Sequence, residues 1–224
     1  MARKIKIPNH IQKRERQELK RAEVIRNKRL FFLIVCEGEK TEPNYFESLK
    51  NALPKGVLDV KITGTGNNTV SLVRNAKNIR KQTEAETNRK IDKLWVVFDR
   101  DSFKPQSFNS AIQKCADKAD MDCAWTNEAF ELWYLLHFHY YNTGIGRAQY
   151  QDLIEQNFRS KGLHDYKYQK NSTEMFDLLE KYGSRENAVA NAQRLETAYN
   201  GRQDYANHNP CTKVHKLVSE LFGL

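Results

Sequence analysis

Two short apolar runs constrain the fold of this chain more than any other feature. Residues 30–36 (LFFLIVC) are followed directly by Glu37-Gly38, and residues 94–98 (LWVVF) are followed by Asp99-Arg100-Asp101. Continuous apolar runs of this length, without a polar face, predict strands that are buried on both sides, as in a parallel sheet. Each of the two predicted strands therefore ends in acidic residues.

The stretch from residue 30 to residue 138 alternates between strand and helix patterns. Further strands are predicted at 57–62 and 121–125, and helices at 41–53, 70–86, 108–119 and 128–138. This alternation is typical of an α/β domain with a parallel sheet flanked by helices. Residues 146–224 have wholly helical patterns, at about 147–159, 172–182, 185–199 and 211–222. We therefore predict three parts: an arm over residues 1–29, an α/β domain over 30–140 and a helical C-terminal region over 141–224.

The positive charge of the chain is concentrated at its N-terminus. The formal net charge is +9, and residues 1–30 hold 11 of the 37 Lys and Arg residues but 3 of the 28 Asp and Glu residues. The remainder of the chain is therefore nearly neutral. Basic arms bind nucleic acid through its phosphates. A solvated tail would have the same composition, so the arm alone leaves both interpretations open.

Cysteine usage and hydropathy bear on the cellular compartment. None of the four cysteines forms a CxxC pair, so neither a zinc site nor a redox dithiol is indicated, and a reduced cytosol fits the chain best. No apolar stretch reaches the roughly 18 residues that a membrane span needs. The N-terminus has no apolar signal-peptide core. We therefore expect a cytoplasmic protein without a membrane partner.

The acidic residues after the two strands predict a metal site. Because the carboxyl ends of parallel strands lie along one edge of a sheet, Glu37, Asp99 and Asp101 converge if the two strands are neighbours. Crowded carboxylates repel one another unless a cation neutralises them, and Mg²⁺ is bound by a few carboxylates together with water and phosphate. Such a site suits phosphodiester cleavage. Glu131, inside an apolar helical run, is a further carboxylate that needs solvent, a base or the metal as its partner.

Other interpretations of these acidic residues remain open. Acidic residues can end strands simply as solvated turns, although two such endings after two buried strands weigh against this. A receiver-like domain would also hold Mg²⁺ in an acidic cluster, beside an Asp that accepts phosphate, but it would leave the helical third of the chain unexplained. A nucleic-acid-binding or partner-controlled effector module without strong catalysis is a third alternative, motivated by the basic arm and the helical region.

Four segments of the chain resemble known motifs. They are LIVCEGEKTEPNYFESL, WVVFDRDSF, NEAFELWYLLHF and the C-terminal NPCTKVHKLV. These segments, which span about residues 30–220, are similar to motifs of the RloB-like family, which is assigned to the Toprim superfamily. The resemblance implies a Toprim-like α/β domain, with the Toprim glutamate at Glu37 and metal-binding aspartates at Asp99 and Asp101. Related nucleases have a second acid shortly after the Glu-Gly pair. Here Glu42 is the nearest match, with a spacing one residue longer than in those nucleases, and Glu39 is the other candidate for this second acid.

The resemblance also implies a role in defence against phage or foreign DNA, with an ATPase as a partner protein. Lys40 follows the acidic turn and can stabilise charge on a phosphoryl group; Lys167 and Lys170 are candidate phosphate contacts, although each lysine can equally be a solvated cation. We therefore expect a metal-dependent nuclease that acts on DNA or tRNA with Mg²⁺, or Mn²⁺ in its place. The predicted catalytic residues are Glu37, Asp99, Asp101, Glu131 and Lys40, the metal ligands are Glu37, Asp99, Asp101, Glu42 and Glu131, and the nucleic-acid contacts are Lys40, Lys213 and His215.

Overall fold

The computed structural model describes residues 13–14, 16–18, 29–56, 58–66, 69–101, 104–117 and 119–223. Most of the predicted basic arm lies outside these residues, so its contact with nucleic acid stays a prediction. Within the described parts of the chain, no helix combines the length and the apolar character needed to cross a membrane.

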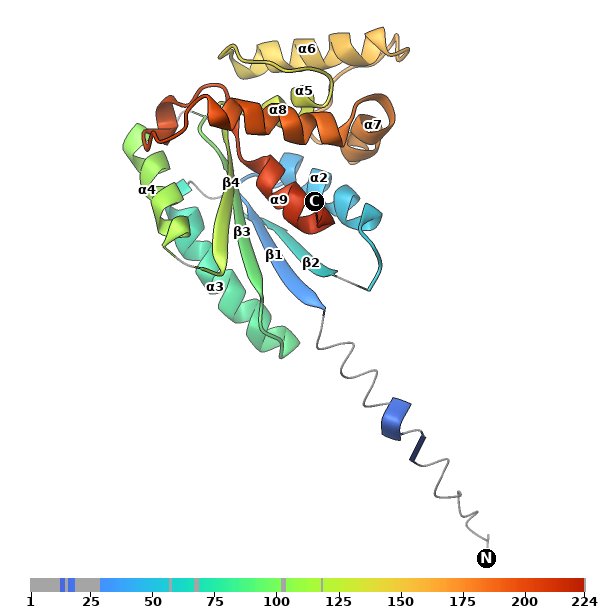
Figure 1. Ribbon diagram of the computed structural model, residues 1–224, viewed down its shortest axis with the longest axis vertical. Helices are drawn as coiled ribbons and strands as arrows, with labels where there is room; N and C mark the ends of the chain where they lie inside the picture. Colours follow the sequence, from blue (N-terminus) through green and yellow to red (C-terminus); the bar gives the residue numbers. More distant parts are fainter. Residues whose placement is uncertain are drawn as a thin grey trace, which may run out of the picture.

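A twisted sheet forms the centre of the fold (Figure 1). Its strands are β2 (Leu58–Gly64), β1 (Leu30–Cys36), β3 (Lys93–Asp99), β4 (Met121–Asn127) and β5 (Cys211–Thr212), in this spatial order. The first four are parallel to one another, and β5 pairs antiparallel with β4 at the edge. The strands β1 and β3 are direct neighbours, with Cys36 opposite Val97, so their carboxyl ends lie side by side.

Helices cover both faces of the sheet (Figure 1). On β1, Ile34 belongs to the apolar layer on one face, and the next residue, Val35, belongs to the layer on the other. Because both faces are buried, these strands have no polar side, which is why their sequences are continuous apolar runs. The predicted α/β, Toprim-like architecture is thus confirmed. The first layer contains α2 (Thr41–Ala52) and α9 (Val214–Phe222), and the second contains α3 (Thr69–Thr87) and α4 (Pro105–Ala116).

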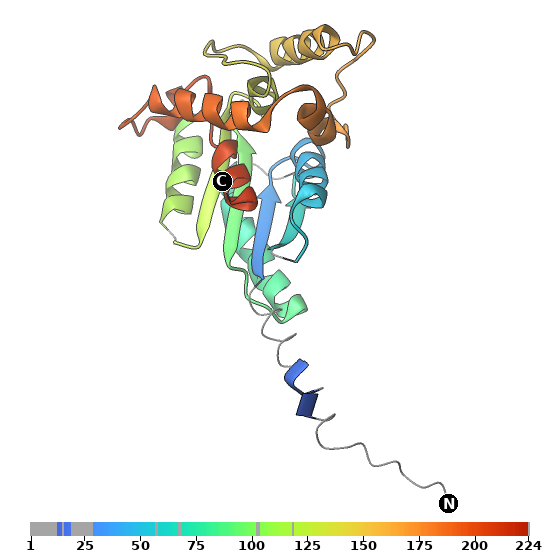
Figure 2. The same cartoon turned by 45° about the vertical axis from the view of Figure 1, so that its right-hand side comes forward.

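A second group of helices lies beyond the carboxyl ends of the strands (Figure 2). Ile154, Leu179 and Leu195 are buried in the same apolar layer as α2 and α9, so these helices share one core with the sheet. These helices therefore lie over the carboxyl edge of the sheet. The group consists of α5 (Glu131–Leu136), α6 (Arg147–Ser160), α7 (Met175–Tyr182) and α8 (Arg185–Thr197), and a short 3₁₀ helix, η1 (Tyr205–Asn207), follows it.

The last helix begins later than the sequence pattern predicted. The helix expected from residue 211 starts at Val214, because Cys211 and Thr212 pair with β4. The Thr212 hydroxyl lies 2.9 Å from the Thr126 hydroxyl and accepts the Val214 N–H at 3.2 Å. This side chain therefore bonds both to the sheet and to the start of α9. Between residues 141 and 223 the structure therefore consists of helices and this edge strand, joined by loops such as residues 161–174.

Candidate active site at the carboxyl edge of the sheet

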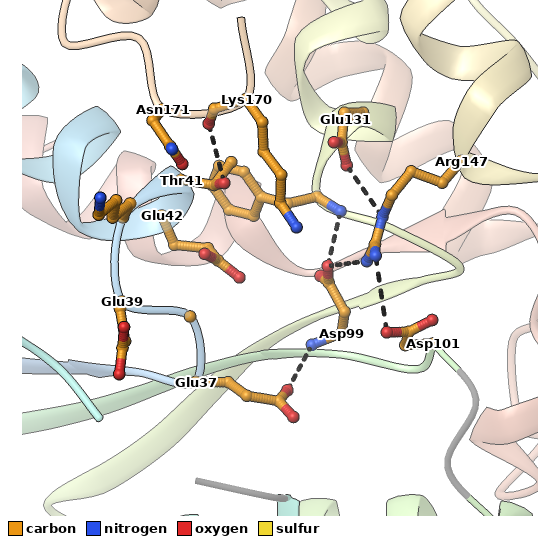
Figure 3. A pocket seen from close by; sticks show the side chains of 13 residues that line it. Glu37, Glu39, Thr41, Glu42, Asp99, Asp101, Glu131, Arg147, Lys170 and Asn171 are labelled. Atoms are coloured by element: carbon orange, nitrogen blue, oxygen red, sulfur yellow. Dashed lines mark hydrogen bonds and ion pairs between the residues drawn. The ribbon is translucent and has the colours of Figure 1, made fainter. Parts of the chain in front are cut away.

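Glu37 and Asp99 are in contact at the ends of β1 and β3. The hydrogen-bond ladder between the two strands continues past Cys36, because the Glu37 N–H donates to the Val97 carbonyl at 2.8 Å. The Glu37 side chain reaches β3, where Oε2 accepts the Asp99 N–H at 3.2 Å (Figure 3). The acidic residues that end the two apolar runs are thus brought together by the parallel pairing of their strands.

These residues line a cavity of about 460 Å³. Its walls come from the two strand ends, the starts of α2, α5 and α6, and the segment that precedes α7. All the predicted metal ligands and Lys40 are therefore located at one cavity. The lining residues are Glu37, Gly38, Glu39, Lys40, Thr41, Glu42, Asp99, Asp101, Phe130, Glu131, Arg147, Lys170 and Asn171.

Asp99 is buried, and within the described part of the chain only one of its carboxylate oxygens has a hydrogen-bond partner. Oδ2 accepts the Phe130 N–H at 3.0 Å and lies 3.5 Å from Arg147 Nη2, whereas none of the described residues bonds to Oδ1. Burial, followed by the charges of Glu42 and Glu131, raises the pKa of Asp99 well above its usual value. A buried oxygen without a partner is costly unless a ligand contacts it.

Asp101 is positioned at the rim of the cavity by a left-handed turn. Its φ angle is 35°, a region that Asp adopts more readily than most residues. The Asp101 N–H donates to the Glu128 carbonyl at 3.1 Å, which attaches the turn to the segment before α5. The side chain is 45% exposed, against 10% for that of Asp99. The Asp-x-Asp motif therefore supplies one enclosed carboxylate and one that faces solvent.

Gly38 leaves space for the side chain of Glu42. A Cβ atom at position 38 would overlap the Glu42 carboxylate, so a larger residue there would require this side chain to move. Glu42 is buried in the first turn of α2, and burial is the main cause that raises its pKa, with the charge of Glu131 adding to it. Glu39 is exposed, and its carboxylate lies beside Gly66. Of the two competing acids, the geometry favours Glu42.

Arg147 is a residue of the cavity that the sequence did not indicate. It is the first residue of α6, and its guanidinium lies among the carboxylates of Asp99, Asp101 and Glu131 (Figure 3). The nitrogen–oxygen distances are 3.5, 3.6 and 3.8 Å, respectively. No motif marks this position, since one arginine at the start of a predicted helix looks like any surface cation.

The segment before α7 closes the cavity between α2 and α5. The Tyr168 hydroxyl donates to Glu131 Oε1 at 3.0 Å, and the Thr41 hydroxyl donates to the Lys170 carbonyl at 2.9 Å. Glu131 is therefore bonded to this segment, and Lys170 is held at the cavity wall. The other candidate lysine, Lys167, instead lies 3.5 Å from Glu155 on α6 and does not line the cavity.

Lys213 and His215, the predicted nucleic-acid contacts in the closing motif, lie at a different cluster. Lys213 forms an ion pair with Glu196 on α8, as does Lys216, and His215 Nε2 lies 3.1 Å from a carboxylate oxygen of the same Glu196. The hydrogen bond from His215, with those from the two lysines, holds the pKa of Glu196 well below its usual value. Neither residue lines the acidic cavity, so any contact with nucleic acid would be made outside it.

The donors at the cavity fit a hard cation such as Mg²⁺. Six of the lining residues are acidic and three are basic. Burial, with the charges of Glu42 and Asp101, raises the pKa of Glu37 to about 7, and one oxygen of Asp99 lacks a partner among the described residues. Within the same residues, no three His, Cys, Asp or Glu side chains are gathered as ligands around one point. Mg²⁺ needs no such cage, because it keeps several waters and uses one or two carboxylates.

Comparison with known proteins identifies a family. A family model described as RloB-like protein matches residues 32–221, which is most of the chain and includes every lining residue of the cavity. No curated protein and no solved structure matched the chain.

Proposed function

The chain belongs to the family of RloB-like proteins, and from this premise and the geometry of the cavity we propose that it is a metal-dependent nuclease. The observation that carries the proposal is the convergence of acidic side chains from two strand ends and two helix starts around Asp99, whose Oδ1 has no partner among the described residues. This arrangement supports divalent-cation chemistry on a phosphodiester. The proposed substrate is DNA or tRNA.

The lining residues suggest a division of roles. Asp99 and Glu37 would hold Mg²⁺ or Mn²⁺, with Glu131 and Glu42 close enough to the same space to bind directly or through water. The bound ion would polarise the phosphate and orient water. Alternatively, where Glu37 does not bind the ion, its carboxylate, whose pKa burial raises to about 7, would hold or release a proton near neutral pH as a general acid or base does. Lys40 would balance charge on the phosphoryl group.

The biological setting is proposed from the motifs alone. Their resemblance to the RloB-like family supports a role in the cytoplasm in defence against phage or foreign DNA, under the control of an ATPase partner. The basic arm would add affinity for nucleic acid that does not depend on sequence, through phosphate contacts that weaken as salt increases.

The test is a cleavage assay with a matched control. The full chain is incubated with plasmid DNA, single-stranded DNA and tRNA in Mg²⁺ or Mn²⁺, beside Asp99→Asn and Asp59→Asn. Asp59 lies near the start of β2, at the opposite edge of the sheet, where it pairs with Arg89. We expect Asp99→Asn to lose about 100-fold or more of the activity and Asp59→Asn to keep it. Equal cleavage by wild type and Asp99→Asn would place the activity outside this cavity.

The two alternatives make different predictions for the same proteins. A receiver-like domain would show phosphorylation of an Asp by a small phosphodonor in a mass spectrum, and this would disappear in Asp99→Asn. A binding or partner-controlled module would retain its function in cells when Asp99 is replaced but lose binding to nucleic acid when residues 1–29 are removed. The nuclease proposal instead requires that function in cells be lost when Asp99 is replaced.

A further inference from the structure

We propose that Arg147 is the counter-cation of the acidic cavity. In the metal-free protein its guanidinium pairs with the carboxylates, and it competes with a divalent cation for them. The inference rests on the proposed metal site, and it adds a determinant of metal affinity from outside the acidic motifs. It predicts that the metal-free and metal-bound proteins differ in the contacts of one side chain.

The contacts of Arg147 with the acidic residues are long, so a competing cation can displace the guanidinium. Arginine binds a carboxylate most strongly through two parallel hydrogen bonds of about 2.7–2.9 Å. Here the guanidinium instead divides its contacts among Asp99, Asp101 and Glu131 at 3.5 to 3.8 Å, and its buried Nε has an ion pair but no hydrogen bond within the described residues. A competitor that displaces the guanidinium would therefore break no short hydrogen bond to these acids.

The position of Arg147 is explained by the carboxylates and not by its own helix. Arg147 is the first residue of α6, and the positive end of the helix dipole disfavours a cation there. The side chain is 33% exposed, whereas that of Glu131 is 2% exposed, so the guanidinium lies between the buried acids and solvent. The three ion pairs thus offset an unfavourable location, and the exposed side gives the arginine a direction in which to leave.

The main test measures Mn²⁺ binding to the full chain by electron paramagnetic resonance of the free ion. Removing the competing charge in Arg147→Met should tighten Mn²⁺ binding about tenfold or more, and Arg147→Lys should stay close to wild type. Arg159→Met is the matched control, because Arg159 lies on the same helix with 35% exposure and pairs with Glu155. Equal or weaker Mn²⁺ binding by Arg147→Met, or an equal gain in Arg159→Met, would overturn the inference.

A second measurement uses wild-type protein and so does not depend on the folding of Arg147→Met. The Arg147 Nε–H resonance, assigned by its loss in Arg147→Lys, should shift on titration with Mg²⁺; an unchanged resonance at saturating Mg²⁺ contradicts displacement. The two proposals fail separately. If Arg147→Met binds Mn²⁺ more tightly but the wild-type protein cleaves no substrate, the nuclease proposal is rejected and this inference stands. If the wild-type protein cleaves a substrate in a way that depends on Asp99 but Arg147→Met has unchanged Mn²⁺ affinity, the nuclease proposal stands and this inference is rejected.

Discussion

His137 should make the folded protein sensitive to acid. Its side chain is 1% exposed at the end of α5, the helix that begins with Glu131. Nδ1 lies 2.9 Å from the Trp133 carbonyl oxygen, and the imidazole packs edge-on against the Trp133 ring, with 4.9 Å between the ring centroids. Nε2 has no hydrogen-bond partner among the described residues. Burial disfavours the charged ring and lowers the pKa of His137 from 6.5 to about 4.

The size of the effect follows from the two pKa values. Between about pH 6.5 and pH 4 the unfolded chain binds a proton at this residue that the folded chain does not, so acid favours unfolding. The stability that neutral His137 contributes is therefore present above about pH 6.5 and is lost as pH falls toward 4. At about 1.4 kcal/mol per unit of pKa, the loss is about 2 kcal/mol at pH 5 and about 3 kcal/mol at pH 4.

The assay compares wild type with His137→Gln, which can still donate to the Trp133 carbonyl but cannot take up a proton. Urea unfolding followed by tryptophan fluorescence gives the free energy of unfolding at several pH values, and the difference between the two proteins removes the titration of all other groups. We expect this difference to change by about 2 kcal/mol between pH 7.5 and pH 5. A difference that stays constant, or a His137 resonance that titrates near pH 6.5 in the folded protein, would refute the reasoning.

Two further predictions concern the roles of glutamates. Gly38→Ala should push the Glu42 carboxylate aside and weaken Mn²⁺ binding about tenfold, while Glu39→Gln should leave it unchanged; unchanged Mn²⁺ affinity in Gly38→Ala would remove Glu42 from the set of ligands. Glu196→Gln should lower the free energy of unfolding in urea by about 1 kcal/mol at neutral pH. Because the hydrogen bond with His215 depresses the pKa of Glu196 in the folded protein, this effect should decline as the pH falls from the ordinary pKa of Glu toward the depressed value. Cleavage should persist in this variant, and its loss in a folded protein would connect this cluster to the reaction.

The parts of the fold that could be predicted are those encoded by local patterns. Residues 94–98 are apolar throughout because β3 is covered on both faces, and this also places Asp99 at the strand end. The convergence of Glu37 with Asp99 required that β1 and β3 be neighbours, which no local pattern states. The start of α9 was placed too early for the same reason, because the pairing of Thr212 with Thr126 depends on two segments that are distant in the chain.

The same limit explains why the acidic residues of the cavity were predictable and the arginine among them was not. Acidic residues at strand ends are informative because the strands themselves fix where the side chains must lie. Arg147 lines the cavity and Tyr168 bonds to Glu131 only through the packing of α6 and the segment after it, and in the sequence each is one more polar residue in a helical region. A buried group of carboxylates does require a counter-charge, so some cation could be expected, but 37 Lys and Arg residues were available and only the fold selects among them. The cavity therefore combines residues from both sides of position 140, with the acids from the α/β part and the cation that opposes them from the helical region.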